Sequence, residues 1–263
     1  MESNSLDKII NRKKEKLNLL KNKFKIEDLK YKINKFDKFL DFKEKIYSNF
    51  SKGKFSLIAE IKKASPSAGI IIEDYNPVNI AAIYEKNKAT CLSVLTEEDF
   101  FKGNLDHIFK IKEKVNLPIL CKDFFIDKFQ IPLAKSFGAD AILLIVAALS
   151  QNQLEELYNT ALEYKMSIII EVHTVEEANR IANFKNAIIG INNRNLKTLK
   201  TDLNNTFEIY KTLNNFDGIL ISESGIKNKD DVLKISNQTN IKTFLIGESL
   251  LKNLDSNSIF SIL

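Results

Sequence analysis

Charged and amide residues stand at the ends of several short apolar runs between Phe55 and Gly247, and their types suit proton transfer. In chain order they are Glu60, Lys62, Lys122, Glu171, Asn192 and Glu223. Carboxylates and ammonium groups in one cleft shift each other's pKa values, as acid–base chemistry near neutral pH requires. The chain has no dinucleotide-binding fingerprint, no Walker loop and no clustered Asp/His metal pattern, so we expect chemistry without a cofactor or a metal.

The spacing of these residues decides which of them can act together. Side chains two positions apart on a strand share a face, so Glu60 and Lys62 project to the same side, as do Asn192 and Arg194. Taken singly, any one of them could be a solvated residue that ends a strand. That explanation is much weaker for six residues at the same end of successive strands, where the reactive groups of α/β proteins gather. The pattern therefore favours a single active site at the carboxyl ends of the strands.

Two glycines after the last two apolar runs indicate an anion site. Gly225 and Gly247 would let backbone N–H groups approach an anion, and the Ser224 hydroxyl and the Glu248 amide could add donors. Barrels of alternating strands and helices frequently bind phosphate after strands seven and eight. We therefore expect a phosphorylated small molecule as substrate.

The histidines and the aromatic residues near the strand ends have alternative explanations. His173 shares a face with Glu171 and could be a base, but it lies further into the loop, so we expect a surface or supporting residue. His107 falls in a helix-like stretch and is expected to be structural. Phe101 and Phe124 either fill the core, which is the commoner case, or stack on an aromatic substrate.

Eight apolar runs alternate with helical stretches along the chain. Strands are expected near residues 55–60, 90–95, 118–121, 140–145, 167–171, 187–191, 218–222 and 243–246. Helices are expected over residues 77–87, 105–115, 126–137, 151–164, 175–183, 203–213 and 229–237. The alternation predicts an α/β fold of βαβ units, and eight units close naturally into a (β/α)8 TIM barrel. An open doubly wound sheet is the alternative, but its first turn is usually rich in glycine, and residues 62–67 contain none.

The first fifty residues differ from the rest, because their apolar residues lie at helical spacing among many lysines and form no strand-like run. We expect residues 1–50 to form a helical extension of two or three helices, and residues 51–263 to form the barrel domain. The 263 residues and a hydrophobic content of 44% allow one sizeable core.

Composition also narrows the partners and the compartment. The net charge of +5 invites a nucleic-acid partner, but lysines alternate with acidic residues as on a solvated surface, so we expect none. No apolar stretch approaches the ~20 residues of a membrane span, and no signal-peptide core is present, so we expect a cytoplasmic protein without a membrane partner. Cys91 and Cys121 lie in apolar runs and are expected to be buried and unpaired. We expect a monomer, with a weak dimer as the alternative.

Read together, these segments resemble the indole-3-glycerol phosphate synthase family over nearly the whole chain. The matching stretches are residues 59–67 (AEIKKASPS), 92–97 (LSVLTE), 101–103 (FKG), 118–124 (PILCKDF), 171–173 (EVH), 190–196 (GINNRNL), 222–226 (SESGI) and 245–250 (LIGESL). The resemblance implies a TIM-barrel carboxy-lyase of tryptophan biosynthesis that needs no cofactor. Its substrate would be 1-(2-carboxyphenylamino)-1-deoxyribulose 5-phosphate, and its products indole-3-glycerol phosphate, carbon dioxide and water.

The resemblance also implies roles for individual residues. Lys122 would be the general acid that protonates the ribulose carbonyl, Glu171 its partner in the later dehydration, and Glu60 the carboxylate near the anilino nitrogen. Lys62 would bind the substrate carboxylate. The remaining expected site residues are Asn192, Arg194, Glu223 and Ser224 for orientation, Ser65, Gly225, Gly247 and the Glu248 amide for phosphate, and Phe101, Phe124 and Leu196 for an apolar wall. The N-terminal extension would pack over the barrel mouth.

Two departures from the family pattern are modest: Ala68 stands where a lysine is frequent, and Cys121 occupies an outward-facing position that commonly varies. Two other functions remain as alternatives. One is a phosphate-binding aldolase or isomerase barrel, in which Lys122 would form a Schiff base. The other is a basic nucleic-acid-binding protein that uses the lysine-rich first fifty residues.

Overall fold

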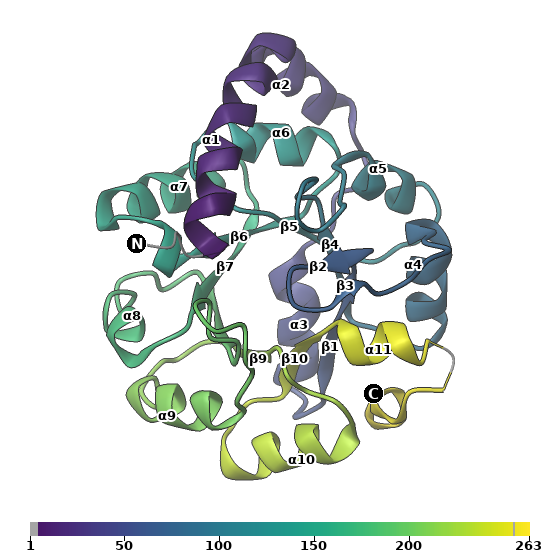
Figure 1. Cartoon of the computed structure of the whole chain (residues 1–263), viewed down its shortest axis with the longest axis vertical. Helices are drawn as coiled ribbons and strands as arrows, with labels where there is room; N and C mark the ends of the chain where they lie inside the picture. The colour runs from purple at the N-terminus through teal and green to yellow at the C-terminus, as the bar shows by residue number, and fades with distance from the viewer. Residues whose placement is uncertain (1–4, 255) are drawn as a thin grey trace.

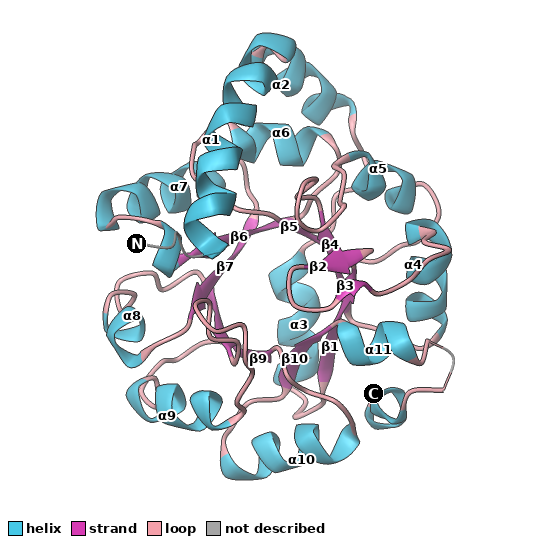
Figure 2. Ribbon diagram, in the orientation of Figure 1, coloured by secondary structure: helices cyan, strands magenta, loops and turns pink. Residues whose placement is uncertain are grey.

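Eight parallel strands form a closed barrel, as the alternation of apolar runs predicts. The structure, a computed structural model, describes residues 5–254 and 256–263. The barrel strands are β1 (Ser56–Ile61), β4 (Cys91–Leu95), β5 (Ile119–Lys122), β6 (Ala141–Ile145), β7 (Ser167–Val172), β8 (Ile188–Asn192), β9 (Leu220–Glu223) and β10 (Thr243–Ile246). Each strand pairs in parallel with its neighbours in chain order, and β1 closes the ring by pairing with β10. Figure 1 looks into this ring, and Figure 2 separates its strands from the surrounding helices.

A helix follows every barrel strand and lies outside the ring. The helices are α4 (Pro77–Lys86), α5 (Asp106–Lys112), α6 (Gln130–Ser136), α7 (Gln151–Glu163), α8 (Val175–Asn179), α9 (Asn204–Thr212), α10 (Lys229–Gln238) and α11 (Glu248–Lys252). Several begin at an N-cap side chain that accepts a backbone N–H, for example Asn76 before α4 and Ser150 before α7. The (β/α)8 prediction is confirmed.

Three local features differ from the prediction. Helix α6 begins at Gln130 rather than near residue 126, because the Gln130 amide oxygen accepts the N–H groups of Ile126 and Asp127 and holds that stretch as a loop. Helix α8 ends at Asn179, four residues before the predicted end. The first βα connection contains a small antiparallel pair, β2 (Ala64–Ser65) and β3 (Gly69–Ile70), which is too short to leave a periodic signal.

The strand alternation divides the core into two layers. Inward-facing residues such as Ile58, Leu120 and Ile169 fill the barrel, whereas outward-facing residues such as Leu57 and Ile168 pack under the helices. Cys91 belongs to the inner layer and Cys121 to the outer one, and both are buried without a disulfide, as predicted. Two short 3-10 segments, Val146–Ala148 and Ser258–Ile262, complete the elements.

The N-terminal region forms three helices that lie at different places on the barrel. These are α1 (Ser5–Lys23), α2 (Ile26–Lys35) and α3 (Phe42–Phe50). Phe42 and Ile46 of α3 pack against the inner barrel layer, and the Lys43 N–H donates to the Ser167 hydroxyl at the start of β7. Helix α3 therefore closes the amino end of the barrel and is seen behind the ring in Figure 1.

Helix α1 lies at the carboxyl ends of the strands. Its Leu17 packs with Leu29 of α2, with Leu133 of α6 and with Phe129, the residue before α6. Within the described part of the chain, no helix combines the length and the apolar character needed to cross a membrane.

Candidate active site

The Lys122 side chain lies among three buried carboxylates at the carboxyl ends of the strands. Its Nζ is 2.7 Å from Glu223 Oε2, 3.6 Å from Glu171 Oε2 and 3.7 Å from Glu60 Oε2. These residues lie at or next to the ends of β1, β5, β7 and β9. The barrel therefore brings together side chains that are far apart in the sequence, with a separation of 163 positions between Glu60 and Glu223. A second ammonium, Lys62 Nζ, is 2.6 Å from Glu60 Oε1. The convergence of these side chains, expected from the strand-end pattern, is observed.

The carboxylate cluster determines the charge of each member. Burial alone would lower the pKa of Lys122, but attraction to Glu223, Glu171 and Glu60 outweighs burial and raises it above its ordinary value. Burial raises the pKa of Glu60, but Lys62 and Lys122 outweigh that effect and lower it. At neutral pH the site therefore holds a protonated Lys122 against an ionised Glu60.

Glu171 and Glu223 compete for the same cation, and their pKa values move apart. Burial raises both, but Lys122 and His173 lower the pKa of Glu171, whereas Glu223 remains raised by its burial and by repulsion from Glu171. Two carboxyl groups whose environments push their pKa values apart suit one to hold a proton while the other stays ionised.

A mostly apolar cavity of about 140 Å³ opens on one side of Lys122. Phe101, Phe124 and Leu196 line it, together with Leu95, Leu143 and Ile145 from the strand ends. The rings of Phe101 and Phe124 lie 6.2 Å apart in a tilted arrangement. Such a wall suits a planar apolar group held next to the charged cluster.

A wider polar cavity of about 850 Å³ adjoins the apolar one, and Lys122 borders both. Ser224, Gly225, Gly247 and Glu248 line it, and it is rich in cations: Lys62, Lys122, Arg194, Lys200, Lys227 and Lys252. The residues that line both cavities are Glu60, Lys62, Ser67, Lys122, Arg194, Leu199 and Ser224. A substrate with an apolar end and an anionic end would therefore have its middle beside Lys122.

Arg194 links two of the loops that border both cavities. Asn192 Oδ1 accepts the Arg194 N–H at 2.9 Å, and Arg194 Nη1 donates to the Leu199 carbonyl and to the Ser67 hydroxyl. The loop after β8 is thereby joined to the loop after β1, with Asn192 holding the backbone of Arg194 and with Leu199 and Ser67 holding its guanidinium.

Most predicted site residues line one of these cavities, and two are placed differently from their predicted use. Ser65 borders only the apolar cavity, and its hydroxyl accepts the Ala68 N–H, whereas Ser67 borders both cavities. Glu223 lines neither cavity, because it is completely buried behind Lys122. Glu223 therefore reaches a bound molecule only through Lys122.

Gly247 is needed where β10 ends because Glu60 approaches its backbone closely. A Cβ at this position would lie 2.6 Å from Glu60 Oε1 and 3.0 Å from Glu60 Cβ. The sequence pattern assigned Gly247 only to an anion site. The close approach of Glu60 is a second reason why a residue without a Cβ is required there.

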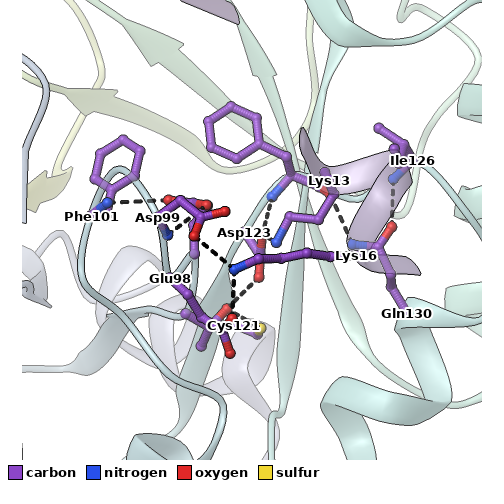
Figure 3. A network of polar contacts seen from close by, with 12 residues as sticks. Lys13, Lys16, Glu98, Asp99, Phe101, Cys121, Asp123, Ile126 and Gln130 are labelled. Carbon is purple, nitrogen blue, oxygen red and sulfur yellow. Dashed lines mark hydrogen bonds and ion pairs between the residues drawn. The ribbon is translucent and has the colours of Figure 1, made fainter. Parts of the chain in front are cut away.

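Helix α1 contributes residues that the sequence pattern did not assign to the site. Ser5, Leu6 and Ile9 line the apolar cavity. Ion pairs attach the helix to the loops after β4 and β5: Lys13 to Asp123 with both side chains buried, and Lys16 to Glu98 and Asp99 nearer the surface. Figure 3 shows both lysines reaching from α1 toward these acids, with Phe101 on the same loop as Asp99.

The two histidines have different surroundings. His173 is buried, with Nε2 3.1 Å from Glu171 Oε1, so it is a supporting residue of the cluster rather than a surface residue. His107 is half-buried and contacts the Tyr75 ring, away from the cluster. Across residues 5–254 and 256–263, no group of three or more His, Cys, Asp or Glu is placed to hold a metal ion.

Comparison with known proteins agrees with this geometry. The family model of indole-3-glycerol phosphate synthase matches residues 6–262. The curated indole-3-glycerol phosphate synthase of Prochlorococcus marinus subsp. pastoris is 45% identical over 262 residues, covering 98% of this chain and 88% of that protein. The enzyme of the same name from Aliarcobacter butzleri is 40% identical over 251 residues, covering 94% and 93%.

Solved structures share the fold at low sequence identity. The tryptophan synthase α subunit of Legionella pneumophila matches with a TM-score of 0.59 and 13% identity, over 80% of this chain and 87% of that one. A 3-hexulose-6-phosphate synthase matches with a TM-score of 0.60 and 10% identity, over 79% and 95%. These two show the barrel alone, whereas the family match and the curated relatives cover the strand ends that build the site. The chain therefore belongs to the indole-3-glycerol phosphate synthase family.

Proposed function

We propose that this chain converts 1-(2-carboxyphenylamino)-1-deoxyribulose 5-phosphate into indole-3-glycerol phosphate, carbon dioxide and water, a step of tryptophan biosynthesis. The observation that carries the proposal is the position of Lys122, between an apolar cavity and a cation-rich one and among three carboxylates. The substrate has the matching order of groups: an aromatic ring, a carbonyl that reacts, and a phosphate.

Lys122 is the general acid in this scheme. Ring closure forms a bond between an aromatic carbon and the ribulose carbonyl carbon, and the carbonyl oxygen must gain a proton as it becomes a hydroxyl. The raised pKa of Lys122 keeps its ammonium protonated at neutral pH, so a proton is available at the point of attack. Carbon dioxide is then lost, and the electron pair of the broken carbon–carboxylate bond returns to the ring, where it re-forms the double bond.

The acidic residues divide the remaining steps. Glu171 borders the apolar cavity and exchanges a proton in the dehydration that removes the hydroxyl as water. Glu60 stays ionised and stabilises positive charge that develops on the anilino nitrogen. Glu223 is a positioning residue, which holds Lys122 from behind at 2.7 Å.

The two cavities hold the ends of the substrate. Phe101, Phe124 and Leu196 enclose the aromatic ring, which keeps water from the reacting carbons. Lys62 binds the ring carboxylate until it leaves as carbon dioxide. Arg194 and Ser224, which border both cavities, orient the sugar hydroxyls together with Asn192 of the apolar cavity. The phosphate is received by Gly225, Gly247 and the Glu248 amide, with Ser65 in the adjoining loop.

A Schiff-base mechanism on Lys122 is less well supported by the same observation. A nucleophilic amine must first lose its proton, and three nearby carboxylates oppose that loss. Borohydride added during turnover is therefore expected to trap no substrate on Lys122. A stable adduct there would favour an aldolase.

The organisation and surroundings of the protein complete the proposal. Residues 1–50 act as an extension of the barrel domain 51–263, with α1 over the mouth, where Leu6 and Ile9 reach the apolar cavity. Several of its cations, including Lys13 and Lys16, are engaged in ion pairs rather than arrayed for nucleic acid. We propose a cytoplasmic enzyme, monomeric or at most a weak dimer, without a nucleic-acid or membrane partner.

The direct test mixes the protein with carboxyphenylamino-deoxyribulose phosphate in buffer that contains EDTA and follows indole fluorescence. The chain contains no Trp, so the background is low. The proposal expects an indole signal with one carbon dioxide released per indole. A folded protein that produces neither would contradict it.

A further inference from the structure

His173 connects the reactive cluster to a carboxylate outside it. It directly follows β7, two residues after Glu171, and its side chain is only 5% exposed. Nε2 lies 3.1 Å from Glu171 Oε1, and Nδ1 lies 3.4 Å from Glu177 Oε2. The imidazole therefore lies between two carboxylates, one in the site and one on α8.

Glu177 is itself held in place by local structure. Its Oε2 accepts the His173 backbone N–H at 2.7 Å, and its own N–H donates to the hydroxyl of Thr174, the N-cap of α8. From α9, the Asn205 amide donates to the His173 carbonyl. These bonds fix the backbone of His173, and the contacts of its two ring nitrogens with Glu171 and Glu177 hold the ring without help from a bound substrate.

The two oxygens of Glu171 face different partners. Oε1 is on the His173 side, whereas Oε2 lies 3.6 Å from Lys122 Nζ. Within the described residues, Oε2 is buried and has no hydrogen-bond partner. Glu171 borders the apolar cavity, but His173 and Glu177 line neither cavity. One oxygen of Glu171 is thus supported from behind, while the other is left for the substrate.

The charges around this pair come from several elements. Lys122, Glu223 and Glu60 face Glu171 from within the barrel, and Glu177 faces His173 from α8. Burial lowers the pKa of His173, but Glu171 and Glu177 outweigh it and raise the pKa to about 10. The ring is therefore a cation at neutral pH and favours the ionised form of Glu171.

We propose that His173 is a positioning residue of the reaction, which Glu177 holds against Glu171 Oε1 so that Glu171 stays ionised and presents Oε2 to the substrate. The inference rests on the proposed role of Glu171 in proton transfer. His173 touches no reacting atom, so it acts on turnover through Glu171 and leaves substrate binding nearly unchanged.

The kinetic test compares His173→Gln and Glu177→Gln with Glu176→Gln, which removes an exposed carboxylate from the same turn of α8. His173→Gln is expected to lower kcat about tenfold to a hundredfold, part of a typical acid–base contribution, with KM within about threefold. The acidic limb of its kcat–pH profile should move to higher pH, because Glu171 loses a neighbouring cation. Glu177→Gln should show the same shift to a smaller extent, and Glu176→Gln none.

A spectroscopic test uses the fact that the chain has only two histidines. In nitrogen-15 histidine spectra of the wild-type protein, one ring should stay protonated well above pH 7. The other, assigned to His107 by His107→Gln, should titrate below its ordinary pKa of 6.5, because burial and Lys110 lower it. Glu177→Gln should lower the pKa of the His173 ring.

The outcomes separate the two proposals. A His173 ring that is neutral at pH 7.5, or a folded His173→Gln variant with wild-type kcat and pH profile, would overturn the inference while indole formation stands. Absence of indole from the wild-type protein would instead contradict the proposed function, whatever the histidine spectra show. If His173→Gln does not fold, the inference is tested by the pH profile of Glu177→Gln and by the charge of the His173 ring in the wild-type spectra.

Discussion

Gly247→Ala tests whether the position of Glu60 matters for the chemistry. The added Cβ would lie 2.6 Å from Glu60 Oε1, where an ordinary contact begins at 3.4 Å, so the carboxylate must shift by roughly 0.8 Å. That oxygen is also 2.6 Å from Lys62 Nζ, so the pair must rearrange together. A misplacement of about 1 Å at a reacting group costs roughly a hundredfold in rate, or about 2.7 kcal/mol.

The expected effect on stability is smaller than the effect on activity. Over-packing costs about 1–3 kcal/mol, and the loss of glycine entropy from the unfolded chain offsets about 0.4–1 kcal/mol of it. Gly53→Ala is the matched control: Gly53 has φ +68° on the far side of the barrel, so its variant should lose stability and keep its activity. Urea unfolding and initial rates of indole formation measure the two quantities separately.

A double variant distinguishes displacement of Glu60 from obstruction of the phosphate. If Glu60 is the target, Gly247→Ala should lower kcat little further when Glu60→Gln is already present, because both changes act on one group. A blocked phosphate would appear as a raised KM in both backgrounds. A Gly247→Ala protein with kcat within threefold of wild type and a displaced Glu60 would refute the reasoning.

The remaining predictions concern three charged groups. Glu171→Gln should lower kcat by about a hundredfold or more, measured as indole formation at saturating substrate, and a near-normal rate would remove Glu171 from the mechanism. Lys13→Met should cost about 3 kcal/mol in urea unfolding, because it leaves the buried Asp123 unpaired, whereas Lys16→Met at the more exposed pair should cost less than about 1 kcal/mol. His173 has a folded-state pKa raised to about 10, so its stabilisation is complete below its unfolded pKa near 6.5 and lost as pH rises through 10. The stability difference between wild type and His173→Gln should therefore shrink across that interval, and a difference that grows with pH would contradict the assigned charge.

The strand ends could be predicted from sequence because two simple rules act on them. Buried parallel strands must be apolar, so Ile168 to Ile170 reveals where β7 lies, and the polar residue that ends the run marks the mouth. The alternation of side chains then pairs Glu60 with Lys62 on one face, as observed.

Features that depend on three-dimensional neighbours left little signal in the sequence. Leu6 and Ile9 fit an amphipathic helix wherever that helix docks, so their place in the apolar cavity follows from tertiary packing alone. Glu223 has the same parity as the other site residues, yet it is completely buried and Lys122 lies between it and the cavities. The separation of α1 and α3 to opposite ends of the barrel was likewise hidden, because both contain lysine-rich helical patterns.

The account depends most on Lys122 as the proton donor, and single-turnover kinetics of Lys122→Met test this directly. With enzyme in excess over substrate, indole fluorescence reports ring closure, and substrate binding is measured separately by equilibrium titration. The account predicts binding within about tenfold of wild type and indole formation at least about a thousandfold slower, because the ammonium that lies near all three carboxylates is gone. Indole formation within tenfold of the wild-type rate would contradict it.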